Sequence, residues 1–290
     1  MRPSPTGLTS EDSKQQAFRD EVISLYEHEP DLLALPGLLF SSVATLTDAD
    51  VVSYAECHQR SKALRILVSP EDDLATDGRL MQAIARLRNT HGPGGHPLLQ
   101  YDPAFYGERA LRESDFFSDA EFMALPIARE VLLPSNAHRL LAIVFQHEGY
   151  AVTVAGHRVT GSQPFSDGDR DRLQALRPHI VRCYRQAQQR TVARLGPAER
   201  LQLAFPTLTP RQLEVCGWLA QGKSNEDIAA ILGVSVDTVK VHARVIYDKL
   251  GAEGRHAVAV IAHTVPPFAQ LPPLWTLRTA APGEGSAARS

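Results

Sequence analysis

The stretch "LTPRQLEVCGWLAQGKSNEDIAAILGVSVDTVKVHARVIYDKLG", Leu208–Gly251, decides the fold of the C-terminal part of the chain. At three places a side chain suited to capping a helix precedes a helix-forming run: Thr209, Ser224 and Ser235. Pro210 suits a first helical position, and Gln212 can complete a capping box with Thr209. Gly222 and Gly233 end the first two helices. A short helix, a tight glycine turn and a longer helix predict a helix-turn-helix unit.

The third helix of this stretch has two faces of different chemistry. At 100° per residue, four apolar side chains share a narrow arc that would pack inward: Val239, Ala243, Ile246 and Leu250. Lys240, Val241 and Arg244 point roughly the other way. Lysine and arginine can pair with guanine, and an exposed valine can contact a thymine methyl group. Cations four residues apart also occur on ordinary surface helices. These residues alone therefore do not exclude an ordinary helical hairpin that has no role in DNA binding.

The region resembles the LuxR-type (FixJ/NarL-type) DNA-binding domain. The likeness lies in "LTPR", "LAQGKSN", "IA", "LGVS", "TVKVH" and "KLG", which follow family order and spacing from Leu208 to Ala262. It implies an all-α, four-helix domain over 207–263 whose third helix enters the major groove of double-stranded DNA. It implies base contacts by Lys240, Val241 and Arg244. It also implies backbone contacts by Lys223, Ser224, Asn225, Thr238 and Lys249.

The charge of this segment bears on how it would bind. Thr209–His263 contains six basic and six acidic residues, so its nonspecific attraction to DNA should be modest. We therefore expect a homodimer that engages two half-sites together. The stretch "AEGRHAVAV" replaces the more usual "VSSRTEAV" of the family. This replacement affects the start of the last helix, on which family members often dimerise.

The rest of the 290-residue chain predicts a second, larger domain. We expect a disordered N-terminus over 1–16, a mixed α/β domain over 17–190, a linker over 191–206 and a flexible tail over 264–290. Within the α/β domain, the sequence predicts helices near 16–28, 31–46, 76–92 and 166–189. It also predicts a strand pair in "DVVSYAECH" and "ALRILVS", and a hairpin that turns at Glu148 and Gly149.

Three kinds of sensor commonly precede a LuxR-type DNA-binding domain, which is called here the reader. A phosphoacceptor receiver is disfavoured because Asp48 and Asp50 follow a helix and no aspartate ends the expected strand. An acyl-homoserine-lactone receptor remains the alternative, although Trp218 and Trp275 lie outside the α/β domain. "SDFFSDAEF", a hairpin and "FSDGDRDRLQALRPHIVRCYRQA" resemble GAF-like or PAS-like sensors. For a small-molecule pocket, the candidate lining residues are Tyr54, Tyr101, Phe105, Tyr106, Phe116 and Phe117, each of which could equally pack in a core.

Other classes of function find little support. The chain lacks a GxSxG, P-loop or HExxH motif, and His91 and His96 have no third ligand, so neither an enzyme nor a cofactor or metal site is expected. Three separated cysteines, no long apolar run and no secretory signal favour the cytoplasm and no membrane partner. The sequence predicts a regulator with DNA, a second copy of the chain and RNA polymerase as partners. A protein-binding adaptor without DNA readout stays as an alternative.

Overall fold

The computed structural model describes residues 10–69, 107–264, 268 and 271–276, together with residues 82, 84 and 86. The chain forms two compact units, Met1–Gln188 and Gln189–Ser290. None of the helices in the described part of the chain has the length and apolar content needed to cross a membrane.

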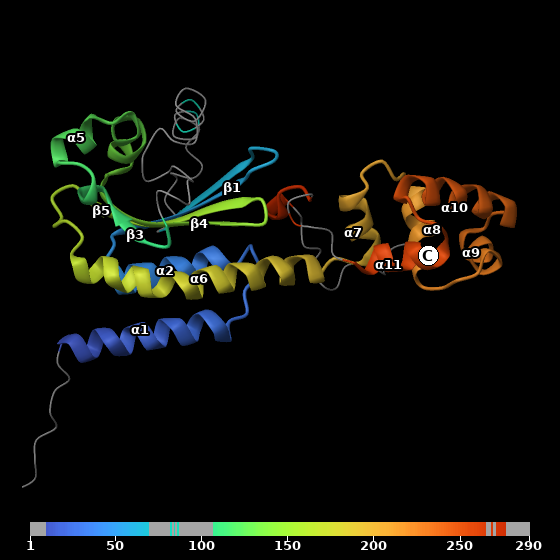
Figure 1. Cartoon of the computed structure of the whole chain (residues 1–290), viewed down its shortest axis with the longest axis horizontal. Helices are drawn as coiled ribbons and strands as arrows, with labels where there is room; N and C mark the ends of the chain where they lie inside the picture. Colours follow the sequence, from blue (N-terminus) through green and yellow to red (C-terminus); the bar gives the residue numbers. More distant parts are fainter. Residues whose placement is uncertain are drawn as a thin grey trace, which may run out of the picture. The chain divides into compact units, whose positions relative to one another are not determined.

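The N-terminal unit is built on a five-stranded antiparallel sheet with the order β2-β1-β5-β4-β3 (Figure 1). The strands are β1 Val51–His58, β2 Leu64–Ser69, β3 Ala110–Arg112, β4 Ala137–His147 and β5 Tyr150–Val159. The predicted strand pair and hairpin are confirmed. The hairpin turns at Glu148 and Gly149, whose φ angles of 42° and 85° give the left-handed backbone that a two-residue turn requires.

Helices cover both faces of the sheet (Figure 1). One face, called here the α6 face, is covered by α2 Leu35–Thr47 and α6 Asp167–Ala193, with α1 Ser10–Glu27 outside them. The opposite face, called the α5 face, packs against α5 Asp119–Ala124 and the π-helical turn η5 Ala128–Leu132. Single 3-10 turns, η4 Glu113–Asp115 and η6 Leu133–Ser135, flank these two elements. Because side chains alternate along a strand, consecutive residues within β1, and likewise within β5, point to opposite faces of the sheet.

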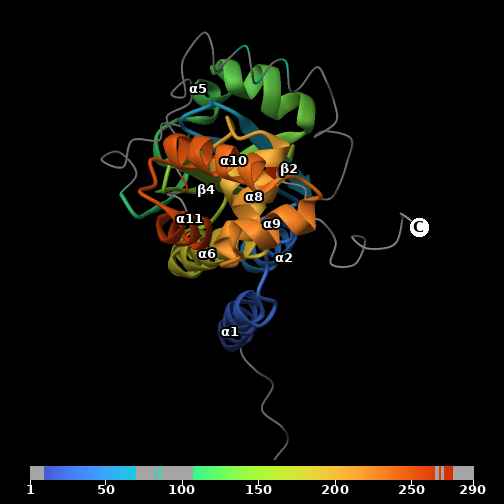
Figure 2. The same ribbon diagram turned by 90° about the vertical axis from the view of Figure 1, so that its right-hand side faces the viewer.

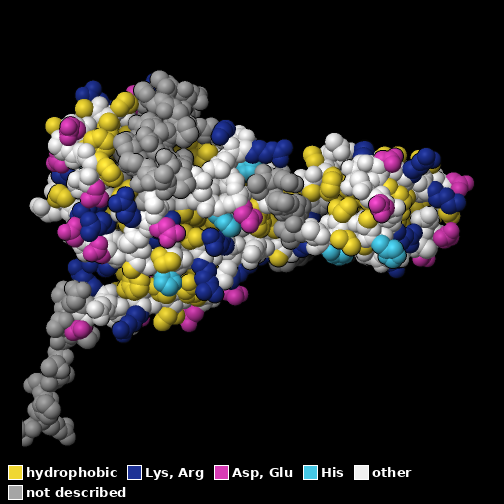
Figure 3. Space-filling model, viewed as in Figure 1, with side chains coloured by type: hydrophobic (Ala, Val, Ile, Leu, Met, Phe, Trp, Pro, Cys, Tyr) yellow, Lys and Arg dark blue, Asp and Glu magenta, His cyan; other side chains and the backbone are white. Residues whose placement is uncertain are grey.

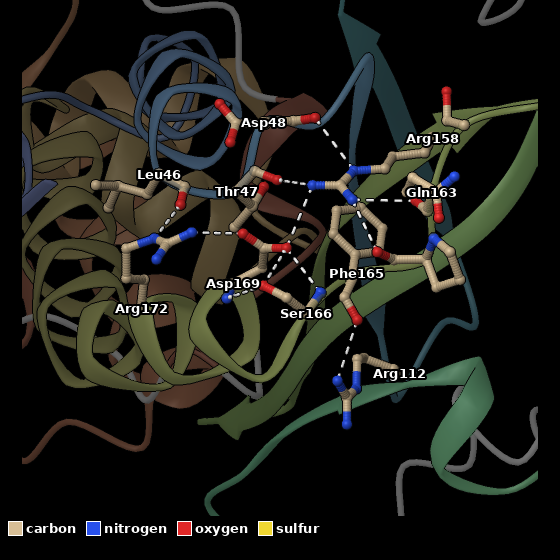
Figure 4. A network of polar contacts seen from close by, with 12 residues as sticks. Leu46, Thr47, Asp48, Arg112, Arg158, Gln163, Phe165, Ser166, Asp169 and Arg172 are labelled. Carbon is tan, nitrogen blue, oxygen red and sulfur yellow. Dashed lines mark hydrogen bonds and ion pairs between the residues drawn. The ribbon is translucent and has the colours of Figure 1, made fainter. Parts of the chain in front are cut away.

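The end of α2 is held by two arginines from distant segments (Figure 4). Arg158 of β5 donates from Nη2 to the Thr47 carbonyl at 2.8 Å, and Arg172 of α6 donates from Nε to the Leu46 carbonyl at 2.6 Å. Both arginines also pair with Asp169, whose carboxylate accepts from Ser166 N at 2.7 Å and so caps α6. The carbonyls left unpaired at a helix end thus find partners, and the network joins α2, β5 and α6.

The C-terminal unit is helical (Figure 2). Its elements are α7 Pro197–Ala204, α8 Pro210–Ala220, α9 Asn225–Leu232, α10 Val236–Leu250, α11 Arg255–His263 and the 3-10 turn η8 Leu274–Thr276. Helices α7 to α11 enclose one apolar core that includes Leu201, Cys216, Ile228, Ile246 and Val258. The predicted fold class, an α/β unit followed by an all-α unit, is confirmed.

Three predicted boundaries need correction. The helix expected from residue 16 begins at Ser10. The expected linker contains α7, which starts at Pro197 because Glu199 caps Gly196 N at 2.7 Å, and which buries Leu201. The expected flexible tail contains η8. The predicted helix over 76–92 lies almost wholly outside the described residues, as do His91 and His96.

Candidate nucleic-acid interface

The three predicted N-caps of the C-terminal unit are confirmed. Gln212 N donates to Thr209 Oγ1 at 3.3 Å, and Thr209 N donates back to Gln212 Oε1 at 3.0 Å. The same reciprocal pair joins Ser224 and Asp227, with both distances 3.0 Å. Ser235 Oγ accepts from Thr238 N at 3.1 Å. These caps set the start of each helix, and therefore the rotation at which α10 presents its side chains.

Helix α10 has the two faces that its sequence predicts. The four inward residues are buried: Val239, Ala243, Ile246 and Leu250. Lys240, Val241 and Arg244 are exposed, and 64% of Val241 is accessible to solvent. An exposed valine between two cations gives this face both the donors and the apolar contact that major-groove readout uses.

An acidic residue lies on the same exposed side of α10. The Asp237 carboxylate is 3.3 Å from Lys240 Nζ, and both side chains are well exposed. Asp237 therefore partly neutralises Lys240 in the free protein. In Figure 3 the charged side chains of both signs are mixed over the visible face of the C-terminal unit.

The side chains predicted to contact the DNA backbone differ in their exposure and in the hydrogen bonds that they already make within the unit. Lys223 is exposed at the turn before α9, whereas the Ser224 hydroxyl caps that helix. The Thr238 hydroxyl lies 2.8 Å from the hydroxyl of Ser235. These positions stay predictions of phosphate contact.

Lys249 makes contacts within the C-terminal unit. Its ammonium group donates to the Thr207 carbonyl and, at 2.8 Å, to Gln212 Oε1, so it ties the end of α10 to the start of α8. An ammonium group has three donors, and contact of Lys249 with a phosphate stays a prediction.

Two arginines with structural contacts were missed by sequence reasoning. Arg211 Nη2 donates to the Leu232 carbonyl at 3.1 Å, and Arg255 contacts the turn before α9. For Arg255 the usable signal was its position, which is retained from the family motif. With Lys249, half of the six cations between Thr209 and His263 donate to acceptors on other helices or turns of the unit.

The predicted pocket residues of the N-terminal unit do not form one group. Tyr54 has 0% exposure on the α6 face and donates to Glu56 Oε2 at 3.1 Å, so it is a core residue. Phe117 packs against the apolar cluster of the α5 face, and Phe116 is exposed. Tyr101, Phe105 and Tyr106 lie outside the described residues.

Polar side chains that the sequence did not single out lie on the α5 face. The Ser53 hydroxyl is 2.8 Å from His157 Nε2. His157 Nδ1 and Thr153 Oγ1 are buried and have no hydrogen-bond partner among the residues that the structure describes. Burial lowers the pKa of His157 to about 4, so the imidazole is neutral near pH 7. Ala55, Ala142 and Ala155 lie on the same face, since they pair across the strands in register with these groups.

The C-terminal unit is similar in sequence to a known protein family. Residues 206–262 match the model of the family "Bacterial regulatory proteins, luxR family". The nitrate/nitrite response regulator protein NarP of Escherichia coli is 46% identical over 57 residues, which is 20% of this chain and 26% of NarP. The monoamine regulon transcriptional regulator of Klebsiella aerogenes is 31% identical over 141 residues, 49% of this chain and 56% of that protein.

Two further similarities extend beyond the C-terminal unit. The quorum sensing-dependent regulator RpaR of Rhodopseudomonas palustris is 32% identical over 136 residues, 44% of this chain and 53% of RpaR. The solved structure of Escherichia coli SdiA covers 81% of this chain and 94% of SdiA, at 18% identity and a TM-score of 0.38. This chain therefore spans about half, or less, of the curated relatives named here. The helices α8 to α11 form a regulatory domain of the bacterial luxR family.

Proposed function

We propose that this protein is a sequence-specific DNA-binding transcriptional regulator. The observation that supports it best is the exposed face of α10, where Lys240, Val241 and Arg244 project from a helix whose opposite face is buried. They lie at the motif positions to which the luxR-family resemblance assigns base contact. A helix so anchored can enter the major groove without disturbing the core of its unit.

The charges favour binding by two copies together. Three cations of the reader make internal contacts, and Asp237 partly neutralises Lys240. Few cations are then left to displace counterions, so one reader should bind DNA weakly and with a small dependence on salt. A homodimer on two half-sites compensates, because the second contact becomes intramolecular.

We further propose that the N-terminal unit binds a small molecule on the α5 face. Ser53, Thr153 and His157 offer hydrogen-bonding groups there, and the small side chains of alanines lie on the same face. Since His157 is neutral, these groups suit an uncharged ligand with polar atoms. An acyl-homoserine lactone is the alternative signal, favoured by the similarity to RpaR, whose name records quorum sensing. The GAF-like character of this unit, its cytoplasmic location and contact with RNA polymerase remain parts of the proposal.

The DNA-binding proposal is tested by selecting bound fragments from the source genome with the full chain. Lys240→Ala and Arg244→Ala should each weaken binding to the selected site by about tenfold or more, the discrimination that a bidentate base contact provides. Each should also change the preferred bases. Lys14→Ala is the matched control, because Lys14 is an exposed lysine on α1 of the other unit. An unchanged site preference in both α10 variants would contradict the assignment of base contacts.

The ligand proposal is tested by thermal unfolding of the full chain with a series of acyl-homoserine lactones. A lactone that binds should raise the unfolding midpoint of the wild type, and Thr153→Val should reduce that rise because it removes one buried hydroxyl. If no lactone shifts the midpoint of the wild type, the alternative signal is wrong.

A further inference from the structure

Arg255 joins the first turn of α11 to the loop that precedes α9. Its Nη1 donates to the Lys223 carbonyl at 2.7 Å, and its Nη2 donates to Asn225 Oδ1 at 3.1 Å. A planar guanidinium presents its donors in a rigid fork, so it fixes the relation between two acceptors more closely than a lysine ammonium on a flexible stem does. The contact thus fixes one backbone group and one side chain of the same short segment.

The backbone of this segment is held at three points. Gly222 takes a φ of 79°, which lets Gly222 N donate to the Leu219 carbonyl at 3.0 Å and Lys223 N to the Trp218 carbonyl at 3.1 Å. Arg255 then fixes the carbonyl of Lys223 itself. Lys223 therefore leaves the turn in a defined direction while its side chain stays exposed.

The contact with Asn225 also sets the orientation of its amide group. Only the carbonyl oxygen of an amide can accept from a guanidinium, so Oδ1 faces Arg255 and the NH2 group lies on the other side of the amide. Phosphate oxygens accept hydrogen bonds and offer none at neutral pH. An amide turned this way presents its donors to a phosphate, whereas a flipped amide would present an acceptor.

We propose that Arg255 is a positioning residue for phosphate contact, which holds the Lys223 backbone and turns the donors of Asn225 towards the DNA backbone. This inference rests on the proposed function, and it goes beyond it by giving Arg255 an indirect role. Arg255 acts through Lys223 and Asn225, so its effect on affinity should be the same for every DNA sequence.

The test compares Arg255→Ala, Arg255→Lys and Asn225→Asp in the full chain. Each variant is titrated with the selected site and with an unrelated duplex, and its unfolding midpoint is measured. Asn225→Asp is the decisive variant, because it keeps the oxygen that Arg255 holds and replaces the NH2 donors with a second acceptor. Arg211→Ala is the control, since it removes the same charge and another contact to a backbone carbonyl.

We expect Arg255→Ala and Asn225→Asp each to weaken binding to both duplexes by the same factor, about tenfold, the value of a hydrogen bond to a charged group. Base preference should not change, Arg255→Lys should recover only part of the loss, and Arg211→Ala should bind as the wild type does. If Arg255→Ala does not fold, Asn225→Asp carries the test.

Wild-type affinity in Asn225→Asp would overturn the inference, and so would full recovery in Arg255→Lys, which would indicate that charge alone matters. If the wild type itself binds no duplex above background, the proposed function fails first. The two failures are therefore distinguishable.

Discussion

The two units of this protein use their polar side chains in different ways. In the N-terminal unit, ionisable groups are part of the interior: Glu56 lies under α6, His157 lies on the α5 face, and Asp169 links two arginines. In the C-terminal unit the core of α7 to α11 is apolar, and Gln212 is the buried polar residue among those described from 199 to 264. Among the residues described from 199 to 264, no Asp, Glu, Lys or Arg is buried.

The buried cluster around Glu56 shows what this difference implies. The carboxylate accepts from the hydroxyls of Tyr184 and Tyr54 and lies 4.0 Å from Arg65 Nη1. Burial raises the pKa of Glu56 despite these partners. The stability of the N-terminal unit is thus coupled to protonation in several places, whereas that of the reader depends mainly on apolar packing. Four substitutions test this difference between the two units.

The largest effect is expected from Ile246→Ala in the reader. Ile246 is fully buried on α10, so its truncation should lower the free energy of unfolding of the C-terminal unit by about 2–5 kcal/mol. Val241→Ala on the same helix should cost far less, because Val241 is exposed. Chemical denaturation followed separately in each unit tests this. Equal losses in the two variants would mean that α10 is not anchored by its inner face.

Asp169→Ala should destabilise the N-terminal unit by about 3 kcal/mol. The substitution removes the carboxylate that accepts from Ser166 N, which is one half of the capping box of α6, and leaves Arg158 and Arg172 without their shared carboxylate (Figure 4). Asp171→Ala, on the exposed side of the same helix, is the control. Urea denaturation measures both, and similar midpoints for the two variants would show that the network contributes little.

Acid should destabilise the N-terminal unit through His157. The pKa of His157 is about 4 in the folded protein, below the ordinary value of 6.5, so the unfolded chain binds more protons between these two values. The stability that the neutral ring contributes is complete above pH 6.5 and falls by about 2 kcal/mol by pH 5.

Unfolding midpoints recorded from pH 7 to pH 5 measure this dependence. His157→Gln should flatten the curve, while His256→Gln, at an exposed position of the reader, should leave it unchanged. A slope that persists in His157→Gln would assign the acid sensitivity to another group.

The smallest effect is expected from Ser235→Ala. Loss of the hydroxyl that accepts from Thr238 N should cost about 1 kcal/mol of reader stability. Thr238 should also be less well placed, so affinity for the selected site should fall more than that loss of stability explains. Ser162→Ala, in the N-terminal unit, controls for the loss of a serine hydroxyl. Unchanged stability would indicate that α10 does not depend on this cap.

Much of the reader could be predicted from its sequence because its determinants are local. The caps at Thr209, Ser224 and Ser235 act within three residues, and the inward stripe of α10 repeats within one or two turns. The same holds for the β4–β5 hairpin, whose turn lies between adjacent strands. Short-range hydrogen bonds and periodicity determine these features. The family-ordered motifs add the prediction that the exposed face contacts bases.

The partners of polar groups that lie far apart in the chain could be identified from the folded structure alone. The sequence could not show that Tyr184 of α6 donates to Glu56 of β1, that Lys249 reaches back to Gln212, or that Arg255 holds Asn225. The sequence of a strand shows that side chains alternate between the two faces of the sheet, but not which helix covers each face. The number of cations in a segment does not show which of them have acceptors within the unit. Those choices depend on contacts between distant segments, because burial makes each unpaired polar atom costly and so selects its partner in three dimensions.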